Sequence, residues 1–302
     1  MKLSMPIYPL EPRFGTEKSL DLIKDAGFEA VDYSLGSLVA DDSVFNSDEY
    51  KARALEIRRM ADQRGLKINQ THAPFTFSIN LWNDPDAFEN IIMPRFYRNL
   101  EISAILGADV SVVHPLHHWT YLGHEEEIFE KNMEYYRRLI PYAKEYGVKI
   151  GVENMFQVDP RRKFIICDTC SEIKEFVRYI DELDSEQIVA CLDIGHIGLV
   201  QQKEEAWDYI RALGHDRLKS LHVHDNDYRA DQHKLPYTGI INWKEVIKAL
   251  GEIDYDGDFT YETGFVVNTM DEEVVPIGLK FMADIGHNMV SRIDACRPGK
   301  GE

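Results

Sequence analysis

The sequence predicts an α/β fold of the (β/α)8, or TIM barrel, type. Short β-branched segments alternate with longer amphipathic stretches from one end of the chain to the other. Eight strand segments are present, and eight is the number of parallel strands that closes into a barrel. The 302 residues suit one such barrel of about 250 residues with extended loops. We see no linker or low-complexity tract, so we expect residues 1–302 to form a single domain.

The expected strands are short apolar runs rich in β-branched residues. Helical stretches separate them, and neighbouring strands joined through a helix run parallel. An open, doubly wound sheet is the alternative, but it favours a glycine-rich phosphate loop after the first strand. The segment YPLEPRFGTEK contains no such motif. The eight expected strands cover residues 2–8, 29–35, 67–73, 109–115, 148–154, 187–196, 218–226 and 258–263.

The stretches between the strands repeat apolar residues at helical spacing. Clear examples are residues 19–28, 49–65, 130–147 and 204–214. Glycine is the usual residue at which a helix stops, because it adopts left-handed backbone angles without strain. We therefore expect helices to end at Gly27, Gly65, Gly147, Gly214 and Gly251.

Charge and composition disfavour several classes of partner. The formal net charge is −18 and the isoelectric point is about 5.0. Such an acidic surface repels nucleic-acid phosphates and anionic membranes, so we expect neither as a partner. No run of about 18 apolar residues is present, and the N-terminal residues do not resemble a signal peptide. We expect a cytoplasmic protein.

Four cysteines do not make a disulfide framework in a chain of this length. Cys167 and Cys170 form a lone CxxC, and no second pair of ligands lies at zinc-finger spacing. We therefore favour chance proximity over a redox or zinc role. In that interpretation Thr169 or Ser171 caps the helix that follows.

Polar residues collect at the carboxyl ends of six consecutive expected strands. In barrels of this type the catalytic groups project from that face. Histidine accounts for only 11 of 302 residues, yet five histidines fall at these ends. Each one alone is better explained as a buried, hydrogen-bonded residue, but their joint occurrence favours a metal or catalytic site. The strand ends carry His72, His114, Glu153, Asp193, His196, His222, His224 and Glu262.

The donor types favour a divalent cation. Two Glu, one Asp and one His carry excess negative charge, and buried carboxylates must be paired or bind a metal. Oxygen donors with one or two imidazoles suit Mn²⁺, Mg²⁺ or Co²⁺, and Zn²⁺ also accepts them. We expect one divalent ion per chain, with Mn²⁺ as the first choice.

The ordered motifs resemble the xylose isomerase-like barrel superfamily of sugar isomerases and epimerases, which also includes endonuclease IV. The resemblance spans nearly the whole chain. Its motifs are HAP (72–74), VVHP (112–115), GVEN (151–154), CLDIGH (191–196), LHVHD (221–225) and YET (261–263).

The resemblance implies the fold, a metal site and a chemistry. In ketose 3-epimerases of the superfamily one metal is held by residues that match Glu153, Asp193, His222 and Glu262, and the two glutamates form the acid/base pair. The position of His196 contacts substrate in that group. Epimerisation requires removal of a proton next to a carbonyl, through a metal-stabilised enediolate. The expected partner is thus a small carbohydrate, phosphorylated or not.

Two alternatives stay open within the same superfamily. Dehydration of an inosose, or elimination from an oxidised sugar, begins with the same proton abstraction. An endonuclease IV-like phosphodiesterase would use up to three zincs, and Asp231 and His233 complete its set of ligand types. Against it, the Thr-Ala-Gly and Asp-Thr-Cys-His signatures of that enzyme are absent. A sugar-binding barrel without activity is disfavoured by the intact pair of glutamates.

The loops above the strand ends should set specificity. We expect His72, His114, His196, Asp231 and His233 to contact substrate. Arg161, in the run Arg161-Arg162-Lys163, is a further candidate for binding a phosphate or carboxylate, although a solvated charge run explains it as well. The turn Pro236-Tyr237-Thr238-Gly239 has Tyr237 where related barrels place glycine. Barrels of this kind commonly pair, so a homodimer or homotetramer is expected.

Overall fold

Eight parallel strands stand side by side in the computed structural model, which describes residues 1–75, 81–118, 120–200 and 203–299. The strand order is β10-β1-β2-β3-β4-β5-β8-β9, and every neighbouring pair is parallel. This confirms the expected (β/α)8 barrel. The strands are β1 (Leu3–Pro6), β2 (Ala30–Ser34), β3 (Lys67–His72), β4 (Val110–Val112), β5 (Lys149–Glu153), β8 (Ile188–Asp193), β9 (Leu218–His222) and β10 (Phe259–Thr260).

The barrel closes between β9 and β10 through a short seam. Val223 and Tyr261 form a single parallel bridge just beyond the two strands. Val223 N donates to Thr260 O at 2.9 Å, and Glu262 N donates to Val223 O at 3.0 Å. The seam thus places Glu262 next to the strand that ends in His222.

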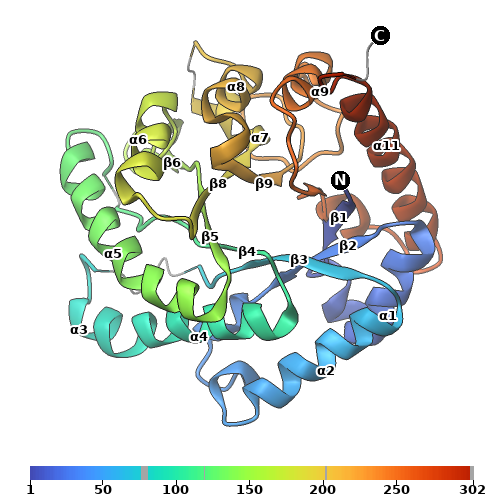
Figure 1. Ribbon diagram of the computed structural model, residues 1–302, viewed down its shortest axis with the longest axis horizontal. Coiled ribbons are helices and arrows are strands. Elements are labelled where there is room, and N and C mark those ends of the chain that lie inside the picture. Colours follow the sequence, from blue (N-terminus) through green and yellow to red (C-terminus); the bar gives the residue numbers. More distant parts are fainter. Residues whose placement is uncertain (76–80, 119, 201–202, 300–302) are drawn as a thin grey trace.

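Helices form a ring outside the strands (Figure 1). Their apolar faces pack on the barrel, and the core is a continuous cluster of buried Leu, Ile, Val, Phe and Tyr side chains. No helix among the described residues is long and apolar enough to cross a membrane. The main helices are α1 (Glu11–Ala26), α2 (Tyr50–Gln63), α4 (Met93–Leu106), α5 (Glu125–Tyr146), α6 (Ile173–Leu183), α8 (Ala206–Arg217), α9 (Trp243–Glu252) and α11 (Val275–Ala295).

Short helices lie in the loops and extend several of these elements. Three of them are α-helices: α3 (Pro85–Ala87), α7 (Ile194–Ile197) and α10 (Phe265–Asn268). One is a π-helical turn, η3 (Phe88–Ile92), which runs directly into α4. Three are 3-10 turns: η1 (Gly36–Val39), η2 (Val44–Asn46) and η4 (Gly198–Val200).

Three of the expected glycine stops are confirmed. Gly27 and Gly147 cap α1 and α5 in left-handed conformation, and Gly65 follows α2 with a φ of 64°. Gly214 has a left-handed φ of 66°, but the helix resumes after this kink and reaches Arg217. The prediction for Gly251 is wrong. It lies inside α9, where a Cβ would come within 2.4 Å of Cys296 Cβ, so this glycine serves close packing instead of a turn.

Two further local expectations fail for identifiable reasons. The segment 187–196 is not all strand, because Asp193 ends β8 and its side chain accepts a hydrogen bond from His196 N at 2.9 Å, which starts α7. Neither Thr169 nor Ser171 caps α6. The N-cap residue is Glu172, and Glu175 of the first turn reaches back to accept from Cys170 N.

A hairpin that the sequence did not predict rises from the loop after β5. Its strands β6 (Phe156–Val158) and β7 (Ile165–Cys167) pair antiparallel, with Phe156 opposite Cys167 and Val158 opposite Ile165. The hairpin stands at the carboxyl ends of the barrel strands, so it adds a wall to whatever site lies there.

Candidate active site and metal centre

Four ionisable side chains meet at the carboxyl end of the barrel. Glu153, Asp193 and His222 are the last residues of β5, β8 and β9, and Glu262 lies two residues beyond β10. One ligand atom from each residue lies within 4.8 Å of one ligand atom from each of the others. These are the four residues for which the sequence predicted metal binding, and the fold brings all of them together.

The imidazole of His222 is the centre of this group. His222 Nδ1 lies 3.0 Å from Glu153 Oε1, 3.6 Å from Glu262 Oε2 and 4.0 Å from Asp193 Oδ2. His222 and Asp193 are fully buried, and Glu153 is 2% exposed. Three carboxylates thus surround one imidazole away from solvent, an arrangement that is unstable unless cations or protons compensate the charge.

The pKa values of the two glutamates are shifted in opposite directions. Burial acts to raise the pKa of Glu153, but the imidazoles of His222 and His114 outweigh it and hold the pKa well below its usual range. Burial raises the pKa of Glu262, and the negative charges of Asp193 and Glu153 raise it further. The surroundings of the two glutamates thus favour the ionised form of Glu153 and the protonated form of Glu262.

The donors fit a divalent cation. Within the described part of the chain, Glu262 Oε2 is buried and has no hydrogen-bond partner. A buried carboxylate oxygen in that position is stable next to a positive charge. Three carboxylates and one imidazole match the oxygen-rich sets that Mn²⁺, Mg²⁺ or Co²⁺ accept, and Zn²⁺ is also compatible with them. The donor types alone do not select among these ions.

A second group lies beside the first and is organised by Asp231. His233 Nε2 lies 2.8 Å from Asp231 Oδ2, and His233 Nδ1 donates to the carbonyl of Glu262 at 2.7 Å. His196 Nδ1 donates to the carbonyl of Asn154 at 2.8 Å, so its Nε2 faces Asp193 at 3.6 Å and Asp231 at 3.9 Å. Burial lowers the pKa of His196, but Asp193 and Asp231 raise it to about 10.

His224 links the two groups. Its Nε2 lies 3.0 Å from Asp193 Oδ1 and 3.6 Å from Asp231 Oδ1. Its ring stacks on that of His233, with centroids 4.2 Å apart. Asp193, His196 and His224 form a second set of donors close enough to hold a cation. The sequence placed His224 at a strand end but assigned it no role.

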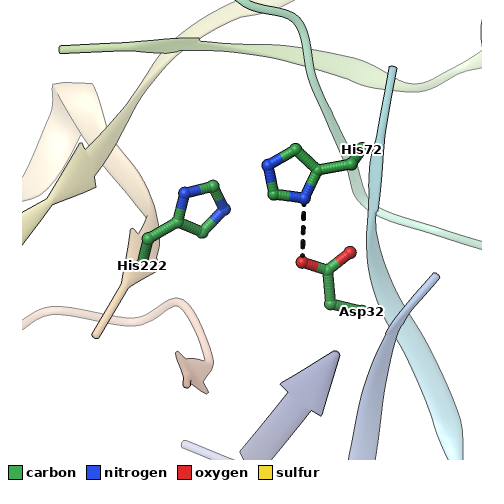
Figure 2. A group of neighbouring side chains, drawn as sticks. All are labelled: Asp32, His72 and His222. Atoms are coloured by element: carbon green, nitrogen blue, oxygen red, sulfur yellow. Dashed lines mark hydrogen bonds and ion pairs between the residues drawn. The ribbon is translucent and has the colours of Figure 1, made fainter. Parts of the chain in front are cut away.

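A third group joins the first from the other side. His114 Nε2 lies 3.0 Å from Glu153 Oε2, and His72, His114 and Glu153 are also close enough to share an ion. Figure 2 shows His72 between Asp32 and His222. His72 stacks on His222 with centroids 4.6 Å apart, and its Nδ1 is hydrogen-bonded to Asp32 Oδ2 at 3.1 Å.

A cavity of about 720 Å³ opens above these groups. All five residues that the sequence predicted to contact substrate line it, together with Glu153 and Glu262. The five are His72, His114, His196, Asp231 and His233.

Arg161 is not brought to the cavity wall. It lies exposed in the turn between β6 and β7, where its backbone N–H donates to Asp159 Oδ1 at 2.8 Å. The neighbouring Arg162 N–H donates to the same oxygen at 2.7 Å, so the Asp159 carboxylate caps the turn. The exposed position of Arg161 therefore favours its interpretation as part of a solvated run of charges over a role in binding an anion.

Sequence reasoning missed several residues of the site. Asp32, 1% exposed at β2, was passed over because a single Asp in a strand reads as part of an alternating pattern. The sequence could have indicated Asp32, because it is a charged residue in an otherwise apolar strand and a buried charge needs a partner. Tyr8 and Phe156 also line the cavity, and no motif pointed to them.

The turn after β9 contains Tyr237 at the position where glycine is usual. Tyr237 adopts a left-handed φ of 73°, which favours glycine. The buried carboxylate of Asp225 compensates by accepting from the backbone N–H of Tyr237 at 3.0 Å and from Trp243 Nε1 at 2.8 Å. Arg292 also donates to the Tyr237 hydroxyl at 2.6 Å.

Comparison with known proteins agrees with this architecture. The family model for xylose isomerase-like TIM barrels matches residues 20–285. An uncharacterised protein of Methanocaldococcus jannaschii, MJ1311, is 28% identical over 194 residues, which is 63% of this chain and 62% of that protein. D-psicose 3-epimerase of Enterocloster bolteae is 28% identical over 251 residues, covering 80% of this chain and 74% of the enzyme.

Solved structures share the fold at lower sequence identity. A D-psicose 3-epimerase crystallised in the presence of D-fructose superposes with a TM-score of 0.75 at 15% identity, covering 96% of this chain and 99% of that one. The IOLI protein, solved with a bound zinc atom, gives a TM-score of 0.71 at 17% identity, covering 98% of both chains.

Proposed function

Because the chain belongs to the xylose isomerase-like TIM barrel family, we propose that it is a metal-dependent enzyme that isomerises or epimerises a small carbohydrate. One observation carries the proposal: Glu153, Asp193, His222 and Glu262 lie close enough to share an ion. Among the described residues, a buried carboxylate oxygen of Glu262 has no hydrogen-bond partner. These four residues would hold one divalent ion per chain, with Mn²⁺ as our first choice. The similarity to a D-psicose 3-epimerase supports a sugar as the substrate.

The roles of the two glutamates follow from their environments. When bound, a divalent cation supplies positive charge that polarises a substrate carbonyl and acidifies the neighbouring C–H. Glu153, held ionised by His222 and His114, is suited to accept that proton. Glu262, the other glutamate of the proposed ligand set, would then be the residue that returns a proton.

The remaining lining residues would orient the sugar. His72, His114, His196 and His233 present imidazoles to the cavity, and Asp231 presents a carboxylate. Imidazoles both donate to and accept from hydroxyl groups, as a polyhydroxylated ligand requires. Their own partners, Asp32 for His72 and the Asn154 carbonyl for His196, fix which ring nitrogen faces the substrate.

The first test is metal content measured together with proton exchange. The chain is purified without chelators, its metal is quantified per protomer, and the Mn²⁺-loaded protein is incubated with a panel of ketoses in D₂O. We expect one ion per chain and loss of a single C–H signal next to the carbonyl of one ketose. Glu153→Gln and Glu262→Gln should abolish the exchange, whereas Glu186→Gln, at an exposed position, should retain it. Full exchange in either active-site variant would refute the acid/base assignment.

Two other reactions are compatible with the same site. Dehydration or elimination uses the same pair of glutamates, and a product that has lost water or a leaving group would reveal it. The additional donor sets, His72-His114-Glu153 and Asp193-His196-His224, favour a phosphodiesterase with up to three zincs. Two or three zincs per chain together with cleavage of abasic-site DNA would establish that reaction in place of the sugar chemistry.

A further inference from the structure

The cavity has two parts of different chemistry. Its floor consists of the carboxylates and imidazoles described above. Its outer wall is apolar and is formed mainly by Phe75, Met155, Phe156, Val158 and Pro160. Pockets that hold drug-sized ligands measure about 300–1,000 Å³, and this one, at about 720 Å³, offers more room than a single sugar ring on the floor would fill.

Two aromatic rings connect the floor to the outer wall. Phe75 meets His114 edge-on, with ring centroids 4.4 Å apart and an interplanar angle of 65°. Phe156 meets His196 in the same manner, at 4.9 Å and 76°. Each aromatic ring therefore contacts an imidazole of the cavity floor directly. A ligand whose polar part lies on the floor must continue against aromatic surface.

The β6–β7 hairpin extends this surface to the rim. Phe156 and Val158 are two residues apart on β6 and both line the cavity. Val158 is 49% exposed, so it leaves apolar area uncovered beside the site. Exposed apolar area that continues into a polar binding site is typical of a surface that a ligand covers.

The outer part also contains a fixed polar group. His117 lines the cavity, and both of its ring nitrogens have partners within the chain: Nδ1 lies 2.8 Å from Asp168 Oδ2, and Nε2 lies 3.5 Å from Gln157 Nε2. Asp168 is 2% exposed, and its other oxygen accepts from Thr169 N at 2.8 Å. A buried carboxylate in this position holds one orientation of the imidazole. Among the described residues, His117 belongs to none of the donor sets that could bind a metal.

The charge of the wall argues against a phosphate. None of the described residues that line the cavity is Lys or Arg, the side chains that usually recognise phosphate groups. A phosphorylated sugar would bring two negative charges to a site already rich in carboxylates. The wall therefore suits a neutral group.

We propose that the outer part of the cavity is a subsite for a neutral, apolar-faced group attached to the reacting sugar, about as large as a second ring. The substrate is then an unphosphorylated carbohydrate that carries its own carbonyl and an aryl or glycosyl substituent. This inference rests on the proposed function, since it assigns the cavity floor to the reacting sugar. The substituent packs against Phe156 and Val158.

The test is a binding comparison that requires no turnover. Isothermal titration calorimetry of the Mn²⁺-loaded full chain compares methyl and phenyl pyranosides of glucose, galactose and mannose that are oxidised to the ketone at C3, so that each probe carries a carbonyl, with each free 3-oxo sugar and its 6-phosphate. We expect at least one phenyl glycoside to bind roughly tenfold more tightly than its methyl partner. The 6-phosphates should bind no more tightly than the free sugars.

Two matched variants locate the effect. Val158→Asp should reduce the preference for phenyl over methyl to less than about threefold without changing the affinity for the methyl glycoside, because a charge on the wall opposes burial of the aryl group. Phe164→Asp is the control: Phe164 lies on the same hairpin and is 47% exposed, but it is not among the residues that line the cavity. That variant should keep the full preference.

Three results would overturn the subsite: no preference for any phenyl glycoside, equal effects of the two variants, or tighter binding of a sugar phosphate. The proton-exchange experiment decides the proposed function separately. Exchange without a phenyl preference would refute the subsite alone, and a phenyl preference without exchange on any carbonyl sugar would refute the proposed reaction alone.

Discussion

Asp32 fixes the orientation of His72. Its Oδ2 lies 3.1 Å from His72 Nδ1 and also accepts from Gln70 Nε2 at 3.0 Å, as Figure 2 shows for the histidine. Burial lowers the pKa of His72, but the charge of Asp32 outweighs it and raises the pKa overall. With Nδ1 occupied, His72 presents Nε2 to the cavity. A carboxylate that no motif identified therefore sets the hydrogen-bonding direction of a residue at the site.

Replacing that carboxylate should reduce activity without unfolding the barrel. In Asp32→Asn the amide cannot accept as strongly from both His72 and Gln70, so the imidazole loses its fixed tautomer. Comparable partners of functional histidines contribute about 10- to 100-fold, and we expect a decrease in kcat/KM of that size. Asp25→Asn, at an exposed position of α1, is the matched control. Unchanged kinetics in Asp32→Asn would show that His72 needs no positioning.

Glu262→Gln should separate stability from metal binding. At mildly alkaline pH, the metal-free variant should melt at a higher temperature than the wild type, because it removes one of three clustered carboxylates. Saturating Mn²⁺ should reverse that order, since ligands that bind only the folded state stabilise it. Differential scanning calorimetry with and without Mn²⁺ measures both. An equal Mn²⁺-induced shift in the two proteins would show that Glu262 does not bind the ion.

Two glycine replacements should have opposite consequences. A Cβ on Gly195 would lie 2.0 Å from His224 Cε1, so Gly195→Ala displaces that ring from Asp193 and should cost about 10²-fold in turnover while the fold is kept. A Cβ on Gly251 would lie 2.9 Å from the carbonyl oxygen of Ile293 in α11. Gly251→Ala should instead lower the free energy of unfolding by about 1–3 kcal/mol and leave turnover intact. Urea denaturation and steady-state kinetics on both variants would test the pair, and exchanged effects would contradict it.

Glu175, which is not one of the proposed metal ligands, should make stability depend on pH. Burial raises its pKa from 4.5 to about 7, although Tyr121 OH and Cys170 N–H both donate to it. The folded state therefore binds a proton more tightly than the unfolded chain. This contribution is fully present below pH 4.5 and is lost as pH rises to about 7.

The change across that window is up to about 3 kcal/mol, and Glu175→Gln should remove it. The measurement is the free energy of unfolding from urea titrations at several pH values, compared between wild type and variant. Parallel curves for the two proteins would mean that Glu175 titrates normally. Glu182→Gln, at an exposed position of the same helix, should follow the wild type.

Much of the barrel could be predicted because its signals are local. Each strand appeared as a short β-branched run, and the strand ends delivered Glu153, Asp193, His222 and Glu262 to one face, as parallel topology requires. The boundaries were less certain. The strand expected to reach residue 196 ends at Asp193 because that side chain caps a helix. The pattern of apolar residues does not reveal such a cap, so it cannot predict where the strand gives way to the helix.

What could not be predicted depends on contacts between distant segments. Gly251 resembles a helix stop, but its reason is the approach of Cys296 from the last helix. The strands β6 and β7 are three residues each, too short for periodicity to reveal. Asp32 became part of the site only because β2 and β3 are neighbours in the sheet, which places its carboxylate beside His72.

Because of the closing seam, the proposed metal site is completed late in the synthesis of the chain. The four proposed ligands come from the second half of the chain, and the last of them, Glu262, reaches the others only when β10 pairs with β1 and bridges to β9. A nascent chain still emerging from the ribosome therefore lacks a complete set of ligands until its first and last strands have met. Binding of an ion would then stabilise this seam, so the ion would help to keep the barrel closed in addition to taking part in the reaction.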